Sequence, residues 1–127
     1  MRKLPPAQDL HRVQLEHDLR TKLLTLRQLF VQATGDNDKI RKLMLDSVTN
    51  FATLFRHTLI AMGEKPSPAK ADNVKQLAAR VNFDPGIFLQ LLQVRARQAS
   101  DSSIDAETGF AKYLESIHKV VAAVDAL

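Results

Sequence analysis

Apolar residues recur along this chain at steps of three and four, the spacing that gathers side chains on one face of an α-helix. The first such run predicts a helix from about Asp9, its N-cap, to about Thr34. Its expected core stripe is Leu15, Leu19, Leu23, Leu26, Phe30 and Ala33. Gly35 is placed to end this helix, and Asp36 offers a cap for the next.

The second run, roughly Asp38 to Met62, is the broadest apolar pattern in the chain. Its members are Ile40, Leu43, Met44, Val48, Phe51, Leu54, Phe55, Thr58, Leu59 and Met62. Because so wide a stripe touches more than one neighbour, we expect this helix to be central, and Gly63 to end it.

Two shorter helices are predicted next. One begins at Lys70 or Asp72 and has an inward face of Val74, Leu77, Ala78 and Val81. The other begins at Asp84, an N-cap followed by Pro85, and ends near residue 98.

The closing helix has two competing N-caps, Ser103 and Asp105. Its stripe is Phe110, Leu114, Ile117, Val121 and Val124, flanked by Tyr113 and Val120. Strand-type alternation is absent, so the sequence predicts an all-α fold, an antiparallel up-and-down bundle of about five helices, two long, two short and one long. Residues 1–8 are expected to be a flexible N-terminal segment and residues 9–127 a single bundle domain.

Length and composition fit this picture, since 127 residues suffice for one core. The chain has no cysteine, which excludes disulfides, thiolate metal ligands and a cysteine nucleophile. It has no apolar run long enough for a membrane span and no signal-peptide pattern, so we expect a cytoplasmic protein without a membrane partner. Two prolines directly before a long helix suggest the end piece of a longer protein.

The net charge of +4 is uneven, because residues 1–60 contain ten Lys and Arg against six Asp and Glu. A basic first half permits a nucleotide or nucleic acid as partner, although such an excess is also common on solvated helices. No recognition motif supports nucleic-acid binding, and the aromatic residues occupy core-like positions.

Motifs for metals and cofactors are missing from the sequence. The histidines lie too far apart in sequence to share one helical face: His11, His17, His57 and His118. The four glycines form no phosphate-binding loop, and neither a nucleotidyltransferase metal motif nor a hydrolase nucleophile motif is present. We therefore expect no cofactor, no metal and no catalytic residue.

One pattern resembles a nuclease motif, an Arg followed by four to six residues and a His, as in HEPN ribonucleases. Arg12 and His17 have this spacing, but they lie in the first helix, whereas the family carries the motif late in its bundle. At the later position Arg95 and Arg97 have no accompanying histidine. RNA cleavage would then lack an acid–base partner.

Arg56 and His57 interrupt an otherwise apolar stretch and are expected at the boundary between core and water. They can serve as ordinary surface residues or contact an anion in a groove, with Arg95 or Arg97 as further contacts. These four residues are the candidate ligand-binding set.

Several segments resemble the helical, substrate-binding-like domain that follows a nucleotidyltransferase-like domain in bacterial proteins, a relative of the HEPN bundles. The similar segments are "KLLTLRQ", "FATLFR" ending in Arg56, "FD" before the fourth helix and "LLQVR" ending in Arg95. The resemblance runs from about Leu15 onward and implies a bundle that shapes a cleft or mediates pairing. It also implies that the catalytic aspartates lie in a partner nucleotidyltransferase domain.

We expect one of three functions. In the first, the chain is a noncatalytic accessory domain that binds substrate or partner beside a nucleotidyltransferase-like domain, in the same chain or a neighbouring protein. Otherwise it is a HEPN-type ribonuclease, or an architectural bundle that forms a homodimer.

Overall fold

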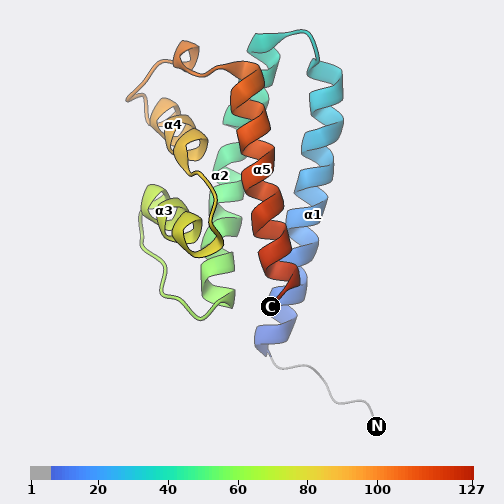
Figure 1. The fold of residues 1–127 in the computed structure, drawn as a ribbon, viewed down its shortest axis with the longest axis vertical. Coiled ribbons are helices and arrows are strands. Elements are labelled where there is room, and N and C mark those ends of the chain that lie inside the picture. The colour runs from blue at the N-terminus through green and yellow to red at the C-terminus, as the bar shows by residue number, and fades with distance from the viewer. Residues whose placement is uncertain (1–6) are drawn as a thin grey trace.

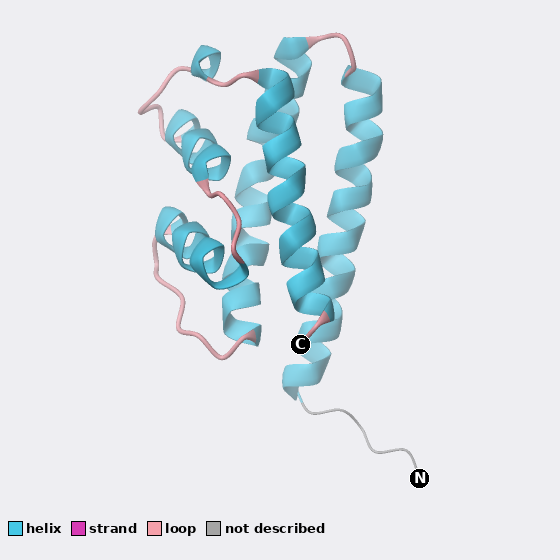
Figure 2. Ribbon diagram, viewed as in Figure 1, coloured by secondary structure: helices cyan, strands magenta, loops and turns pink. Residues whose placement is uncertain are grey.

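A computed structural model describes residues 7–127 of the chain. Within this range the chain forms five α-helices and one 3-10 turn, without any strand (Figure 2). The elements are α1 (Ala7–Ala33), α2 (Asn37–Ala61), α3 (Lys70–Val81), α4 (Gly86–Arg95), η1 (Asp101–Ser103) and α5 (Ala106–Asp125). The all-helical bundle with three long and two short helices is therefore confirmed.

The three long helices lie side by side, and α1 runs in the direction opposite to α2 and α5 (Figure 1). The short helices α3 and α4 stack one above the other against α2, with their axes turned away from those of the long helices. Buried residues from all five helices join in one hydrophobic cluster. Among residues 7–127, no helix combines the length and apolar character needed to cross a membrane.

Helix α1 starts earlier than the sequence indicates. It begins at Ala7, so Asp9 lies inside the helix, and the prediction that Asp9 is its N-cap is wrong. Most of the segment expected to be flexible, residues 1–6, lies outside the described residues. The core stripe of α1 is confirmed, with Phe30 only half-buried and the other five members buried.

Helix α2 is central, as its broad stripe predicts, because it contacts each of the other four α-helices. Gly35 has φ +89°, a left-handed conformation that suits glycine, and lets the chain reverse between α1 and α2. The side chain of Asp36 then accepts the Lys39 N–H at 3.2 Å and caps α2.

The start of α4 lies one residue later than predicted, because Pro85 and not Asp84 occupies its N-cap position. Helix α4 begins at Gly86, and the Asp84 carboxylate accepts the Gly86 N–H at 2.8 Å. Asp105 wins over Ser103 as the cap of α5, since its carboxylate accepts the Thr108 N–H at 2.9 Å.

The buried face of α5 is centred differently from the prediction. Tyr113 and Val120, expected at its flanks, are fully buried, while Leu114, expected in the stripe, is partly buried. The Tyr113 ring packs edge-on against Phe51 of α2 and stacks on Phe88 of α4. Tyr113 therefore joins the long helices to the short ones at the centre of the core.

Candidate functional site

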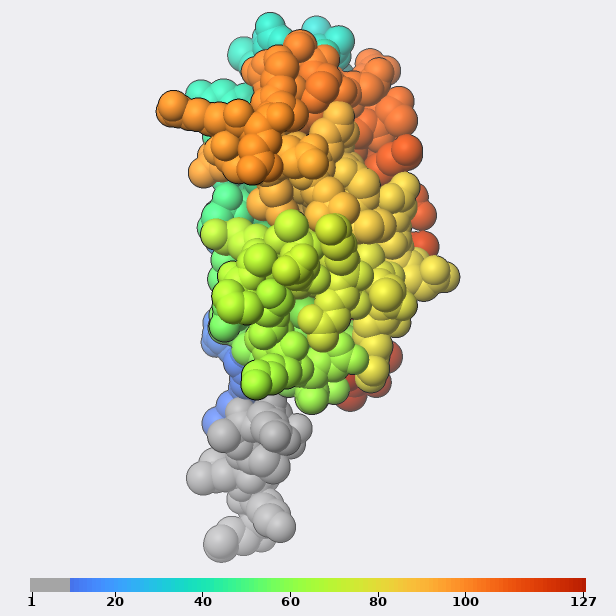
Figure 3. All heavy atoms as spheres, turned by 90° about the vertical axis from the view of Figure 1, so that its left-hand side faces the viewer, coloured from blue at the N-terminus to red at the C-terminus, as the bar shows by residue number. Residues whose placement is uncertain are grey.

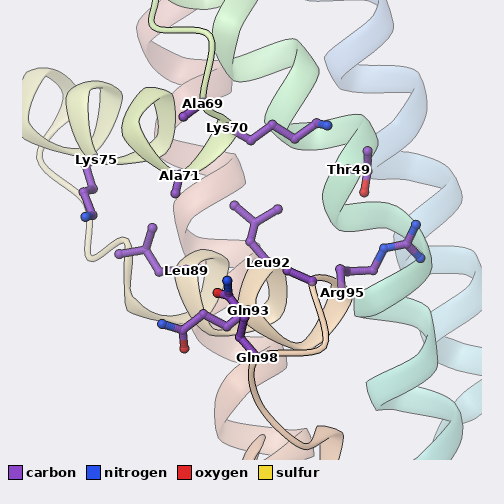
Figure 4. A pocket seen from close by; sticks show the side chains of 11 residues that line it. Thr49, Ala69, Lys70, Ala71, Lys75, Leu89, Leu92, Gln93, Arg95 and Gln98 are labelled. Carbon is purple, nitrogen blue, oxygen red and sulfur yellow. The ribbon is translucent and has the colours of Figure 1, made fainter.

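A groove of about 610 Å³ lies where the beginning of α3 and the end of α4 meet α2 (Figure 4). We call it the α3–α4 groove. Figure 3 turns the face formed by the two short helices towards the viewer. The groove is lined by Thr49, Ala69, Lys70, Ala71, Lys75, Leu89, Leu92, Gln93, Arg95, Ala96 and Gln98.

The groove is positively charged. Lys70, Lys75 and Arg95 are exposed cations at its edge, and none of its lining residues is acidic. Leu89 and Leu92 supply an apolar portion between the cations (Figure 4). A groove that combines positive charge with apolar surface suits an anionic ligand that also has an apolar or planar part.

The first turn of α3 contributes to the same edge. Its N-cap, Ala69, makes no side-chain cap bond, and the helix N-terminus with its partial positive charge lies at the groove because Ala69, Lys70 and Ala71 line it. Asp72 in the same turn offsets part of this charge. The preceding connection is fixed by Asn73, a buried side chain whose Oδ1 accepts the Ser67 N–H at 2.7 Å. This bond holds the chain that leads to Lys70.

Arg95 also borders a second hollow of about 490 Å³, together with Arg97. The structure therefore brings these two predicted residues together. Arg97 has φ +60° and ends α4 in a left-handed conformation. This second hollow has mixed charge, because its lining also includes Asp38, Arg41, Lys42, Asp46 and Asp101. Its carboxylates make it less suited to an anion than the α3–α4 groove.

The structure does not bring Arg56 and His57 to either hollow. Arg56 is exposed on α2. His57 is half-buried and turns towards α1, where its Nδ1 lies 3.3 Å from Nε2 of His11. The four predicted ligand residues therefore do not form one site. Arg95 and Arg97 border the second hollow, whereas Arg56 and His57 lie elsewhere on α2.

The nuclease-like pair does not converge on one site. Arg20 donates a hydrogen bond to the Asp125 carboxylate of α5 and holds its pKa below the usual range, and the charge of Arg12 adds a smaller lowering. His17 is exposed. Five residues along a helix amount to a rotation of about 140°, so the two side chains point to different sides of α1.

His118, the remaining histidine, bonds with Arg27 of α1. Partial burial lowers its pKa, and the Arg27 charge lowers it further. This pair connects α5 to α1 and lies outside both hollows.

Of the four residues that the sequence proposes as ligand contacts, Arg95 alone lines the α3–α4 groove. Lys70 and Lys75 look like ordinary solvated residues in the sequence, and only the packing of α3 beside α4 places them with Arg95. The signal in the sequence for this groove is the predicted helix that starts at Lys70 without a capping side chain before it. Among the described side chains, no cluster of three or more His, Asp or Glu residues could hold a metal ion.

Comparisons with protein-family models, with curated proteins and with solved structures find no match to this chain.

Proposed function

We propose that the chain is a noncatalytic helical accessory domain that binds an anionic ligand in the α3–α4 groove. The groove carries three cations and no lining carboxylate, and this is the observation on which the proposal rests. The resemblance to bundles beside nucleotidyltransferase-like domains makes a nucleotide a reasonable ligand class. In this proposal the catalytic aspartates belong to a nucleotidyltransferase-like domain in the same chain or a neighbouring protein.

Binding of ATP to the purified chain, followed by NMR or calorimetry, tests the ligand class. The variants Lys70→Glu and Arg95→Gln should each weaken binding about tenfold or more, because each removes a positive charge from the groove. Lys70→Glu should still fold, since an acidic residue at a helix N-terminus is favourable.

Lys112→Glu is the matched control, because Lys112 is exposed on α5 and lines neither hollow. If Lys112→Glu weakened ATP binding as much as Lys70→Glu does, the net charge of the chain and not the groove would explain the loss. Absence of ATP binding by the unaltered chain would contradict the proposed ligand class.

The association with a nucleotidyltransferase is tested by reading the DNA upstream of the codon for Arg2 and the adjacent genes. A reading frame with a nucleotidyltransferase motif, whose product binds this chain, is the expected result. Its absence would argue against the accessory role.

A second candidate function, a homodimerisation bundle, is favoured by the outer face of α1. Leu10, Val13, Leu24 and Val31 are between 56% and 72% exposed there. Three of them are spaced by multiples of seven and the fourth by three, as in a helix–helix seam. In sedimentation equilibrium the chain should then self-associate, and Leu24→Glu should give a monomer. A chain that is monomeric at high concentration would exclude this function.

A further inference from the structure

Two imidazoles face each other across α1 and α2. Nε2 of His11 lies 3.3 Å from Nδ1 of His57, and the two ring planes are tilted by 57°. Both side chains are half-buried. The antiparallel helices bring them together because His11 lies 24 residues before Gly35 and His57 lies 22 residues after it.

This separation matches that of two ligands on one metal ion. Histidine nitrogens bind Zn²⁺ at about 2.0–2.1 Å, so two of them at a tetrahedral angle lie about 3.3 Å apart. Imidazole is a preferred ligand for late first-row metals such as Zn²⁺. We propose that His11 Nε2 and His57 Nδ1 form a two-histidine Zn²⁺ site that cross-links α1 to α2.

The chemistry of binding is a ligand exchange. Without metal, one facing nitrogen carries a hydrogen and donates it to the other. When Zn²⁺ binds, that ring carries its proton on the far nitrogen instead, two nitrogen–zinc bonds form, and the six-coordinate hydrated ion releases four of its waters to become a tetrahedral ion that keeps two. Starting from this hydrogen-bonded pair, the exchange releases no net proton, because the ring hydrogen only moves from the facing nitrogen to the far one.

Water fills the remaining positions on the ion, since no third His, Asp or Glu ligand joins the pair among the described side chains. Nearby charge is positive, from Arg12 next to His11 and from the exposed Arg56 next to His57. Both features make the site weaker than a four-ligand structural site and therefore reversible.

The site would act on the beginning of α1. Of the described side chains of α1, none before Leu15 is buried, so apolar packing holds the first turns weakly. The His11–His57 bond connects those turns to α2. A bound Zn²⁺ ion would replace this bond with a coordination link and fix the start of α1 to the bundle. This inference does not rest on the proposed function of the α3–α4 groove.

Titration of the full chain with Zn²⁺ tests the site, by calorimetry and by thermal unfolding. Zn²⁺ should bind and raise the Tm, because it binds the folded pair in preference to the unfolded chain. His11→Gln and His57→Gln should each weaken binding at least about tenfold, by removing a direct ligand. Glutamine keeps a polar side chain at each half-buried position, and circular dichroism checks that the variants fold.

His17→Gln is the matched control, because His17 is an exposed histidine on the same helix, and Mg²⁺ is the control ion, since it prefers oxygen ligands. Both should leave Zn²⁺ binding as in the unaltered chain. Equal Zn²⁺ affinity in the unaltered chain and in a His11→Gln/His57→Gln double variant would overturn the proposal. If the variants do not fold, histidine NMR signals decide, since Zn²⁺ must shift those of His11 and His57 before those of His17 and His118.

Discussion

The hydroxyl oxygen of Tyr113 lies 2.7 Å from Oγ of Ser47, so a hydrogen bond joins α5 to α2 beside the hydrophobic core. The Ser47 hydroxyl also lies 2.9 Å from the Leu43 carbonyl, to which it can donate. Ser47 then donates to the backbone and accepts from Tyr113. The two hydroxyls differ in their number of partners. The buried Tyr113 hydroxyl has Ser47 as its hydrogen-bond partner, whereas Ser47 also bonds to the Leu43 carbonyl.

This inequality predicts that Ser47→Ala destabilises the chain more than Tyr113→Phe. Ser47→Ala leaves a buried hydroxyl without its partner and should lower the free energy of unfolding by about 1–3 kcal/mol. Tyr113→Phe removes the hydroxyl and leaves Ser47 bonded to Leu43, so about 1 kcal/mol is expected. Urea unfolding measures both values, and a larger loss for Tyr113→Phe would show that the bonding roles are assigned wrongly.

Alkaline pH should unfold the chain through the same tyrosine. Burial raises the pKa of Tyr113 well above its ordinary value. The folded chain therefore retains the phenolic proton, while the unfolded chain loses it above about pH 10. Stability must fall as the pH rises through that value, because the unfolded state then binds fewer protons.

Tyr113 is the only tyrosine, so tyrosinate absorbance should appear together with the loss of helical circular dichroism. Tyr113→Phe is the control and should lack this component of the alkaline transition. Tyrosinate that forms near pH 10 in a chain that is still helical would contradict the burial of the hydroxyl.

The end of α3 supplies a backbone prediction. Asn82 is exposed and has φ +67°, a left-handed conformation that asparagine tolerates and alanine does not favour. Asn82→Ala should therefore lower the free energy of unfolding by about 1 kcal/mol, while Asn82→Gly should change it little. Asn50→Ala, at an exposed position within α2, is the matched control and should be neutral or stabilising. If both alanine substitutions changed the Tm equally, the left-handed backbone of Asn82 would not be the cause of the destabilisation.

Apolar spacing predicted most of the fold, because burial on α1 and α2 follows a repeat that can be read directly from the sequence. It misplaced the centre of the α5 stripe, where Tyr113 and Val120 are buried more deeply than Leu114. Spacing defines a broad face, but the position of α4 beside α2 decides which part of that face is enclosed. The predicted N-cap at Asp9 is wrong because acidic residues are favoured both at the N-cap and in the first turn of a helix, and the sequence pattern does not separate these positions.

The candidate sites were less accessible to sequence reasoning. Arg95 was anticipated, but Lys70 and Lys75 join it only through the packing of the short helices. The His11–His57 pair joins residues 46 positions apart. A search for ligands within single helices could not find it, although the similar distances of both residues from Gly35 gave a usable signal once an antiparallel hairpin was predicted.

The helical start of α1 at Ala7 has a mechanical consequence. An α-helix advances 1.5 Å and rotates about 100° with each residue, and it resists bending over a few turns. Any body joined rigidly to this end would therefore be held at a set distance and a set angular phase relative to α2 and α5. Inserting one residue between Leu10 and Leu15 would swing that body about 100° around the helix axis, whereas an insertion of seven would restore its orientation and move it about 10 Å outward.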